Sequence, residues 1–104
     1  MIARTWHGMT SLANADEYLH LMRTIAVPDY QAIAGNRGVY VMRRIEGETA
    51  HFLLLTLWDS EDAIRQFAGE DIEKAKYYDF DPDYLLELEP TVTHYEVFAA
   101  PSND

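Results

Sequence analysis

The residue types best suited to chemistry lie near the start of the chain, where Arg4, Trp6 and His7 share one short segment. An imidazole titrates near neutral pH, so His7 is the best candidate for a general base, with a structural role at a strand end as its alternative. Arg4 is predicted either to form an ion pair with one of the many carboxylates or to anchor a ligand enolate or phenolate. Because side chains alternate along a strand, His7 is predicted to point away from Arg4 and Trp6.

A second group of candidates would bind a substrate. Trp58 ends an apolar strand in the stretch TLWDSEDAIRQF, where its indole either seals the core or forms the wall of a pocket. Tyr40 is predicted to share that wall, and His94 and Trp6 are further candidate substrate-binding residues. Tyr77 lies in an acidic, aromatic loop that forms either a mobile lid or a surface loop packed on its own rings.

Other kinds of site have no support in the sequence. The four histidines include no pair with HxH or HxxxH spacing, so no metal ion is predicted. The lack of cysteine excludes disulfides, thiolate ligands and thiol catalysis. The segment AGNRG lacks the spacing of a phosphate-binding loop, and no nucleophile elbow occurs. The remaining candidates are the ionisable and aromatic side chains named above.

The composition limits the size and the partners of the protein. A chain of 104 residues that is 48% hydrophobic is predicted to form one globular domain over residues 1–104. Its formal net charge of −10 would be repelled by phosphate backbones and anionic lipid surfaces, so neither nucleic acid nor a membrane is an expected partner. No run of about 18 apolar residues occurs, and we expect a soluble, cytoplasmic protein.

Strands and helices must position the candidate residues, and hydrophobic periodicity predicts these elements in the first half of the chain. Residues 2–7 alternate as a strand that ends at Gly8. A helix follows, in which Asn14 opens a capping-box pattern. Pro28 is predicted to end or kink this helix. The buried positions of this helix keep a spacing of three and four residues. They are Ala15, Tyr18, Leu19, Met22, Ile25 and Ala26.

The second half of the chain repeats the alternation of strand and helix. Its predicted elements are a turn at 34–38, a strand at 39–45, a hairpin loop EGET, a strand at 50–58, a helix ending at Gly69, a helical piece at 71–77 and a strand at 92–99. Asp59 or Ser60 is predicted to cap the helix that follows the third strand. Residues 100–104 are predicted to fray.

The order strand, helix, strand, strand, helix, strand is that of the ferredoxin-like βαββαβ arrangement, an α+β fold with a four-stranded antiparallel sheet and both helices on one face. The third predicted strand is apolar on both of its sides. Its two sets are Phe52, Leu54 and Trp58 on one side and Leu53, Leu55 and Leu57 on the other. Since helices cover only one face, a second copy of the sheet is the simplest cover for the other. The sequence therefore predicts a homodimer whose two sheets close into a barrel.

The stretch TLWDSEDAIRQF also resembles the signature of the antibiotic biosynthesis monooxygenase family of dimeric α+β barrels. The matching positions are Trp58 at the strand end, Ser60 and Glu61 at the helix start, and Ala63 and Phe67 within the helix. The resemblance extends over essentially the whole chain, from IARTWHG to THYEVF. The family is functionally mixed: it includes cofactor-independent oxygenases of polyketide anthrones, quinol oxygenases, haem-degrading enzymes and members with no known activity.

The resemblance implies a small monooxygenase that needs no cofactor and acts on an apolar aromatic or quinol-type molecule held between sheet and helices. His7 would deprotonate this substrate, the anion would reduce O₂ directly, and Arg4 would stabilise the anion. The alternative is a non-catalytic dimer of the same fold that binds a small molecule or has a structural role. Haem degradation is a third hypothesis, although Thr5 or its neighbours stand where that branch has an Asn, and the segment EDIEKAKYYDFD contains no histidine.

Overall fold

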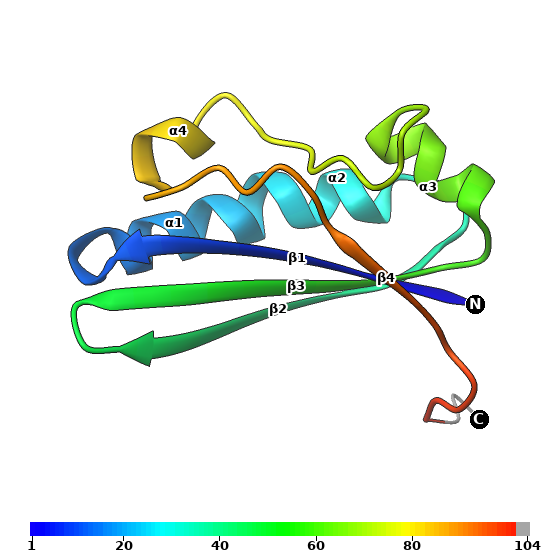
Figure 1. The fold of residues 1–104 in the computed structure, drawn as a ribbon, viewed down its shortest axis with the longest axis horizontal. Helices are drawn as coiled ribbons and strands as arrows, with labels where there is room; N and C mark the ends of the chain where they lie inside the picture. Colours follow the sequence, from blue (N-terminus) through cyan, green and yellow to red (C-terminus); the bar gives the residue numbers. More distant parts are fainter. Residues whose placement is uncertain (102–104) are drawn as a thin grey trace.

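The computed structural model describes residues 1–101 and contains a four-stranded antiparallel sheet with the strand order β2-β3-β1-β4 (Figure 1). The strands are β1 (Ile2–Ser11), β2 (Asn36–Glu46), β3 (Thr49–Trp58) and β4 (Thr93–Glu96). The helices are α1 (Ala15–Leu21), α2 (Val27–Gln31), α3 (Glu61–Ala68) and α4 (Asp81–Tyr84), with a 3-10 turn η1 (Leu12–Asn14) before α1 and a π-helical turn η2 (Met22–Ala26) between α1 and α2. Of the tail that was expected to fray, residues 102–104 lie outside the described part of the chain.

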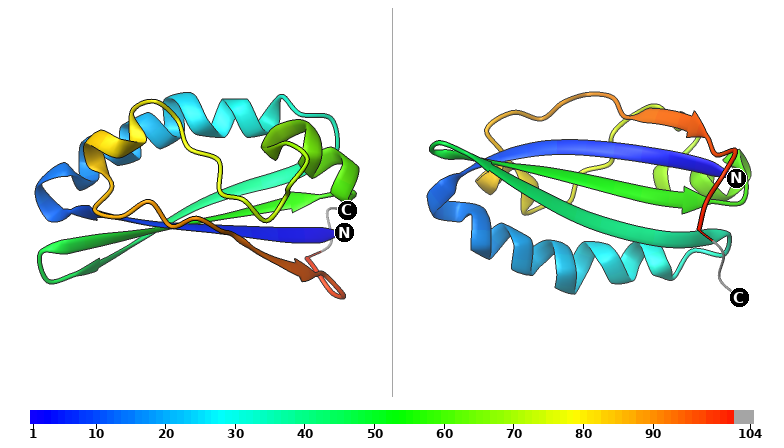
Figure 2. Two further views of the ribbon diagram at one scale, coloured as in Figure 1. Left: turned by 45° about the horizontal axis from the view of Figure 1, so that its top comes forward. Right: turned by 90° about the horizontal axis from the view of Figure 1, so that it is seen from below.

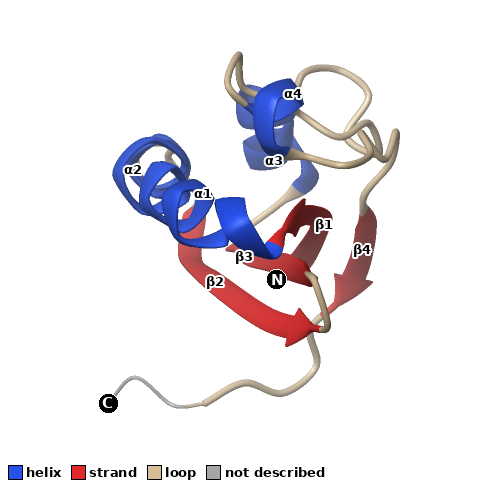
Figure 3. Cartoon of the chain, turned by 90° about the vertical axis from the view of Figure 1, so that its left-hand side faces the viewer, coloured by secondary structure: helices blue, strands red, loops and turns tan. Residues whose placement is uncertain are grey.

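The helices lie on one face of the sheet, as Figures 2 and 3 show. This confirms the predicted α+β class with its four-stranded antiparallel sheet. We call the side of the sheet toward the helices the helix face and the other side the open face. The register of the strands places the following side chains on the open face: Ala3, Thr5, His7, Met9, Tyr40, Met42, Arg44, His51, Leu53, Leu55, Leu57 and Tyr95.

The predicted alternation of β3 is confirmed. Phe52, Leu54 and Trp58 on the helix face are at most 2% exposed, whereas Leu53 on the open face is 37% exposed. Apolar side chains on the helix face bury against the helices and form the core, which supplies most of the free energy of folding. The open face keeps its apolar side chains at the surface of the single chain.

The first strand runs past Gly8 to Ser11, so the prediction that it ends at Gly8 is wrong. The strand continues because Gly8 to Ser11 pair with Phe52 to Thr49 of β3. The ring of Trp6 lies over Gly8, where an added Cβ would stand 2.5 Å from the Cη2 atom of Trp6 and 2.9 Å from Cδ2 of Leu85. Glycine is required at this position because no other residue leaves room for the indole.

The first helix differs from its prediction at both ends. Asn14 makes no side-chain capping bond, and the turn η1 leads into α1 instead. Pro28 does not end the helix, because the π-helical turn η2 precedes it and places it in the first turn of α2, where a missing N–H costs no hydrogen bond. Ile25 is 44% exposed and does not belong to the buried set.

The chain between α3 and β4 also differs from its prediction. Residues 71–77 form a turn and an extended segment rather than a helical piece, because the Ala75 N–H donates to Pro90 O at 3.0 Å and the Val92 N–H donates to Glu73 O at 2.8 Å. The helical turn lies later, in α4, where Pro82 suits a first turn. The last strand is shorter than predicted and ends at Glu96.

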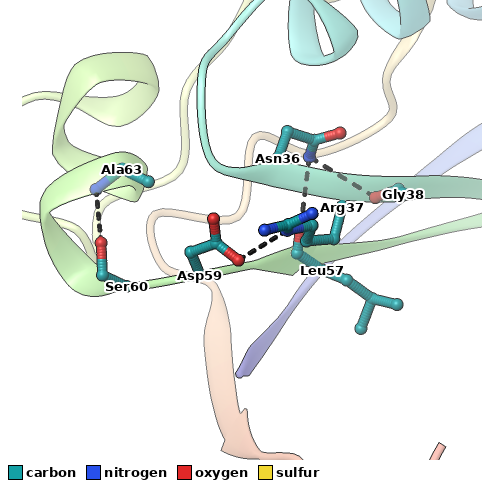
Figure 4. Close-up of polar contacts among 7 residues, drawn as sticks. All are labelled: Asn36, Arg37, Gly38, Leu57, Asp59, Ser60 and Ala63. Carbon is teal, nitrogen blue, oxygen red and sulfur yellow. Dashed lines mark hydrogen bonds and ion pairs between the residues drawn. The ribbon is translucent and has the colours of Figure 1, made fainter.

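Polar contacts hold the corner between β3 and α3 (Figure 4), and two of them involve the residues between the two elements. The Oγ atom of Ser60 accepts a hydrogen bond from the Ala63 N–H at 3.2 Å, which confirms Ser60 as the N-cap. The Nε atom of Arg37 donates to Oδ1 of Asp59 at 2.6 Å and ties the start of β2 to the same corner. These contacts fix the direction in which α3 leaves the sheet.

Within residues 1–101, no helix is both long enough and apolar enough to cross a membrane.

The Gly8 contact gives a first prediction. Gly8→Ala should lower the free energy of unfolding by about 1–3 kcal/mol, since the methyl group would overlap the ring of Trp6. Urea denaturation measures the change. Gly38→Ala is the matched control in β2, where the nearest atoms to an added Cβ are 3.8 Å away, and it should change the stability little. Equal losses in the two variants would contradict the assigned packing of Trp6.

Candidate functional site

Trp58 is a fully buried core residue at the end of β3. Its Nε1 atom donates a hydrogen bond to Oγ1 of Thr56 at 2.8 Å, so the polar edge of the indole is satisfied within the core. The ring centroids of Phe67 and Tyr30 lie 6.0 Å and 6.3 Å from that of Trp58. The indole packs between strand and helices as the core-sealing alternative requires, and its role in binding a substrate stays a prediction.

Arg4 lies on the helix face beside this aromatic group and is 1% exposed. Its Nη2 atom donates to the backbone oxygen of Lys74 at 3.1 Å, and its guanidinium lies 5.7 Å from the ring centre of Phe67. Among the described residues, no carboxylate forms an ion pair with Arg4, so the predicted ion pair is wrong. Burial lowers the pKa of the guanidinium, although its ordinary pKa is so high that the group stays charged. Arg4 is therefore a buried cation without a countercharge.

His94 is the direct cross-strand neighbour of Arg4 and shares the helix face with it. Burial lowers the pKa of His94 below its ordinary value of 6.5, and the positive charge of Arg4 lowers it further. The imidazole is consequently neutral at pH 7 and carries a nitrogen that can accept a proton.

Three buried nitrogen atoms in this part of the sheet have no hydrogen-bond partner among residues 1–101: Nε of Arg4, Nε2 of His94 and Nε1 of Trp6. Buried polar atoms are nearly always satisfied in folded proteins, so three unsatisfied ones on the helix face of neighbouring strands require an explanation. An ordered water or a bound polar molecule would satisfy them. We call Arg4, His94 and Trp6 the polar cluster.

The space between sheet and helices is almost filled by side chains. The cavity that remains there measures only about 10 Å³. Its walls are formed by Trp6, Tyr18, Met22, Ala26, Tyr30, Leu54, Lys76, Tyr78 and Asp81. A larger hollow of about 500 Å³, which we call the edge hollow, opens at the edge of the sheet beside His94. Its lining includes Ile2, Glu61, Ile72, Glu73, His94 and Val97.

The aromatic loop before β4 packs against the core. The side chain of Asp81 accepts hydrogen bonds from the Tyr18 hydroxyl at 2.7 Å and from the Tyr78 N–H at 2.6 Å. The Tyr78 hydroxyl donates to Oδ2 of Asp29 at 2.6 Å. Burial raises the pKa of Asp81 and of both tyrosines. Of the two predicted alternatives, these contacts match the loop packed on its own rings.

The other predicted site residues are divided between the two faces. Tyr77 lies near the polar cluster, with its ring centroid 6.1 Å from that of Trp6. Tyr40 lies on the open face and is 55% exposed, so it shares no wall with the buried Trp58. The reason is the register of β2, which sets Tyr40 opposite Leu55 of β3.

His7 also lies on the open face, as alternation predicts, and is separated by the sheet from Arg4 and Trp58. Its Nδ1 atom is 2.6 Å from Oε2 of Glu89, and its Nε2 atom is 3.0 Å from Nδ1 of His51. The sheet therefore separates His7 from any molecule that is bound to Arg4 of the same chain, so His7 cannot act on it. The Glu89 contact was missed from the sequence, because it joins β1 to a loop 82 positions away.

Comparison with solved structures shows the fold. A Bacillus cereus protein proposed to be an antibiotic biosynthesis monooxygenase superposes with a TM-score of 0.66 at 12% identity, over 97% of this chain and 96% of that one. The haem degrader MhuD from Mycobacterium tuberculosis, with two haems bound in its active site, gives a TM-score of 0.61 at 16% identity, over 98% of this chain and 100% of that one. A point mutant of MhuD with two manganese protoporphyrin IX molecules per active site gives 0.62 at 16% identity, over 99% and 100%. No protein-family model and no curated protein sequence matches the chain. The predicted resemblance is thus confirmed as a shared fold.

The buried position of Arg4 gives a second prediction. Replacing an unpaired buried cation by an apolar residue of similar length removes a desolvation cost, so Arg4→Met should leave the free energy of unfolding unchanged or raise it by about 1 kcal/mol or more. Urea denaturation measures the change against Arg43→Met, which removes an exposed pair with Asp16. If Arg4→Met lowered the free energy of unfolding by more than about 2 kcal/mol, Arg4 would be a residue that stabilises the fold, and its burial would no longer indicate a ligand site.

Proposed function

We propose that the chain binds an acidic aromatic small molecule on the helix face of its sheet and oxidises it with O₂ without a cofactor. One observation carries this proposal: Arg4 is a buried cation without a carboxylate, and it lies directly across from the neutral His94. A fixed positive charge beside a proton acceptor is the combination that a phenol or enol needs in order to ionise in an apolar site. The anion would also provide the acceptor that Nε of Arg4 lacks.

His94 takes the role of base that the sequence assigned to His7, because it shares a face with Arg4. His94 would remove a proton from an acidic O–H or C–H group, and Arg4 would hold the resulting anion. The anion would give an electron to O₂, and the two radicals would join as a C–O–O⁻ group that takes up a proton. In a methylene group between two aromatic rings, loss of water then leaves a carbonyl. One oxygen atom enters the product, the other leaves as water, and the substrate supplies all four electrons.

The edge hollow is the proposed entrance for this substrate. It reaches His94, and its apolar residues Ile2, Ile72 and Val97 suit a flat hydrocarbon surface. The interior cavity of about 10 Å³ is too small for an aromatic ring. Seating a ring beside Arg4 would therefore require the aromatic loop to move, and Tyr78 with its bond to Asp29 is the part of the loop that borders both the cavity and helix α2.

Haem, which MhuD binds, does not fit the residues present on the helix face. The segment between α3 and α4, residues 69–80, has no histidine to serve as an axial ligand. Tyr77 and Tyr78 use their hydroxyls in hydrogen bonds to Glu89 O and Asp29, and burial raises the pKa of both phenols, which opposes ligation as phenolates. The cavity of about 10 Å³ offers no volume for a porphyrin.

The filled interior favours a second candidate function, a protein of the same fold that binds a small molecule without turning it over. In this case Arg4 would anchor a carboxylate or phenolate at the inner end of the edge hollow, and His94 would donate or accept a hydrogen bond. The two candidates share the binding residues. They differ only in whether O₂ is consumed.

We also propose that the working form is a homodimer joined through the open faces. Apolar side chains on this face remain exposed in the single chain: Tyr40 at 55%, Met42 at 43%, Leu53 at 37% and Tyr95 at 58%. A surface of this kind is typical of a protein interface rather than of a monomer. A second copy of the same chain can cover this face across a twofold axis, because the apolar patch then packs against its own equivalent. No other partner is required.

Oxygen uptake tests the proposed activity. We expect consumption of O₂ with a member of a panel of anthrones and quinols, followed with an oxygen electrode. Arg4→Met and His94→Gln should each lower the rate by about 100-fold or more, since one loses the anion stabiliser and the other the base. His20→Gln, which changes an exposed helix histidine, should keep the full rate. Uptake that never exceeds that of buffer would contradict the oxygenase, and ligand binding that persists would then support the second candidate.

Sedimentation equilibrium tests the dimer. The protein should be dimeric at micromolar concentration, and Met42→Glu should weaken the dimer by tenfold or more, that is by about 1.4 kcal/mol, because it places a charge within the apolar face. Ile25→Glu is the matched control, since Ile25 is 44% exposed on the helix layer and Met42 is 43% exposed on the open face. A wild-type protein that sediments as a monomer, or equal weakening by both variants, would contradict the assigned interface.

A further inference from the structure

Four side chains of the open face form one chain of polar contacts that the proposed activity does not use. Oε2 of Glu89 is 2.6 Å from Nδ1 of His7, Nε2 of His7 is 3.0 Å from Nδ1 of His51, and Nε2 of His51 is 3.8 Å from Oε1 of Glu46. The two imidazole rings also stack, with centroids 5.3 Å apart. We call Glu89, His7, His51 and Glu46 the histidine relay.

The partners of the relay fix where its protons lie. A carboxylate only accepts hydrogen bonds, so Nδ1 of His7 carries a proton toward Glu89 and Nε2 of neutral His7 is an acceptor. Nδ1 of His51 must then be the donor across the 3.0 Å contact. Nε2 of His51 is left free to take up one further proton, which would face Glu46. A second added proton would set two N–H groups against each other and break the contact between the rings.

The charges around the rings favour uptake of that one proton when the face is covered. Glu46 and Glu89 are negative, and Arg44 of β2, whose Nη1 atom is 2.5 Å from Oε2 of Glu46, is positive. Arg43 also borders the hollow of about 290 Å³ beside the rings, but it is paired with Asp16. With both imidazoles neutral the relay and Arg44 therefore hold one net negative charge, and one added proton makes them electroneutral.

We propose that the histidine relay couples self-association of the open faces to proton uptake, so that the dimer tightens as the pH falls through the range in which histidine titrates. This inference rests on the proposed dimer and not on the proposed ligand site. A second sheet packed on the open face would remove water from the relay, whose His7 and His51 side chains are now 34% and 20% exposed. Loss of water disfavours a net charge, so the dimer binds the extra proton more tightly than the monomer does.

The sign of the effect follows from proton linkage. Because the dimer holds more protons than two monomers, lowering the pH shifts the equilibrium toward the dimer. With one proton taken up by each chain, the dissociation constant of the dimer changes by at most about 100-fold for each pH unit.

Sedimentation equilibrium across the histidine range tests this inference. Between about pH 8 and about pH 6, the dissociation constant of the wild-type dimer should fall by about tenfold or more. A double variant with His7→Gln and His51→Asn, which keeps amide hydrogen-bonding groups but cannot take up a proton there, should show a dissociation constant that is nearly independent of pH. His20→Asn, on the exposed side of α1, should behave as the wild type.

The outcomes separate the inference from the dimer on which it rests. A dimer whose dissociation constant does not change with pH, or rises as the pH falls from 8 to 6, would overturn the coupling and leave the dimer standing. A monomer at every pH would overturn both. If the double variant does not fold, dilution calorimetry of the wild type in phosphate and in Tris decides the question, because equal heats in the two buffers mean that no proton is taken up on association.

Discussion

The helices of this chain cover only one face of its single sheet, and this arrangement gives the sheet one buried and one open face. Along β1, alternation sends Arg4 and Trp6 to the face that the helices bury and His7 to the face that they leave open. One strand thereby supplies both the buried cation of the proposed ligand site and one histidine of the histidine relay. Arg4 and His7 are near each other in the sequence, but they lie on opposite sides of the sheet.

The buried guanidinium of Arg4 is a costly feature of the fold and the main support for the proposed ligand site. A cation at 1% exposure with no carboxylate destabilises a folded chain unless something else compensates for its lost hydration. Here the compensation comes from one backbone carbonyl, one aromatic ring and the neighbouring Tyr30, whose hydroxyl raises the pKa of the guanidinium. The neighbouring His94 is held neutral for the same reason, because burial and Arg4 both oppose its charged form. A strained electrostatic arrangement of this kind is expected where a ligand anion completes the site.

The sequence allowed the fold to be predicted because local patterns and tertiary packing agree along most of it. The two-sided apolar pattern of β3 and the cap at Ser60 depend on neighbouring residues only, and both were predicted correctly. The failures involve contacts between distant segments. Strand β1 continues through Gly8 to Ser11 because these residues pair with β3, and α4 forms where Asp81 accepts a hydrogen bond from Tyr18, 63 positions away. The missing partner of Arg4 was unpredictable for the same reason, since it depends on where 18 carboxylates come to lie.

The measurement that tests the central claim most directly is an NMR titration of the Nε–H group of Arg4. In a ¹⁵N–¹H spectrum, this buried proton should give a resolved signal that exchanges slowly with water, since the group is shielded but lacks a partner in the free protein. Adding an anthrone under argon, which permits binding but not oxidation, should move that signal strongly and leave the exposed Arg44 unchanged. An Arg4 signal that shifts with none of the anthrones and quinols would contradict the assignment of the polar cluster as a ligand site.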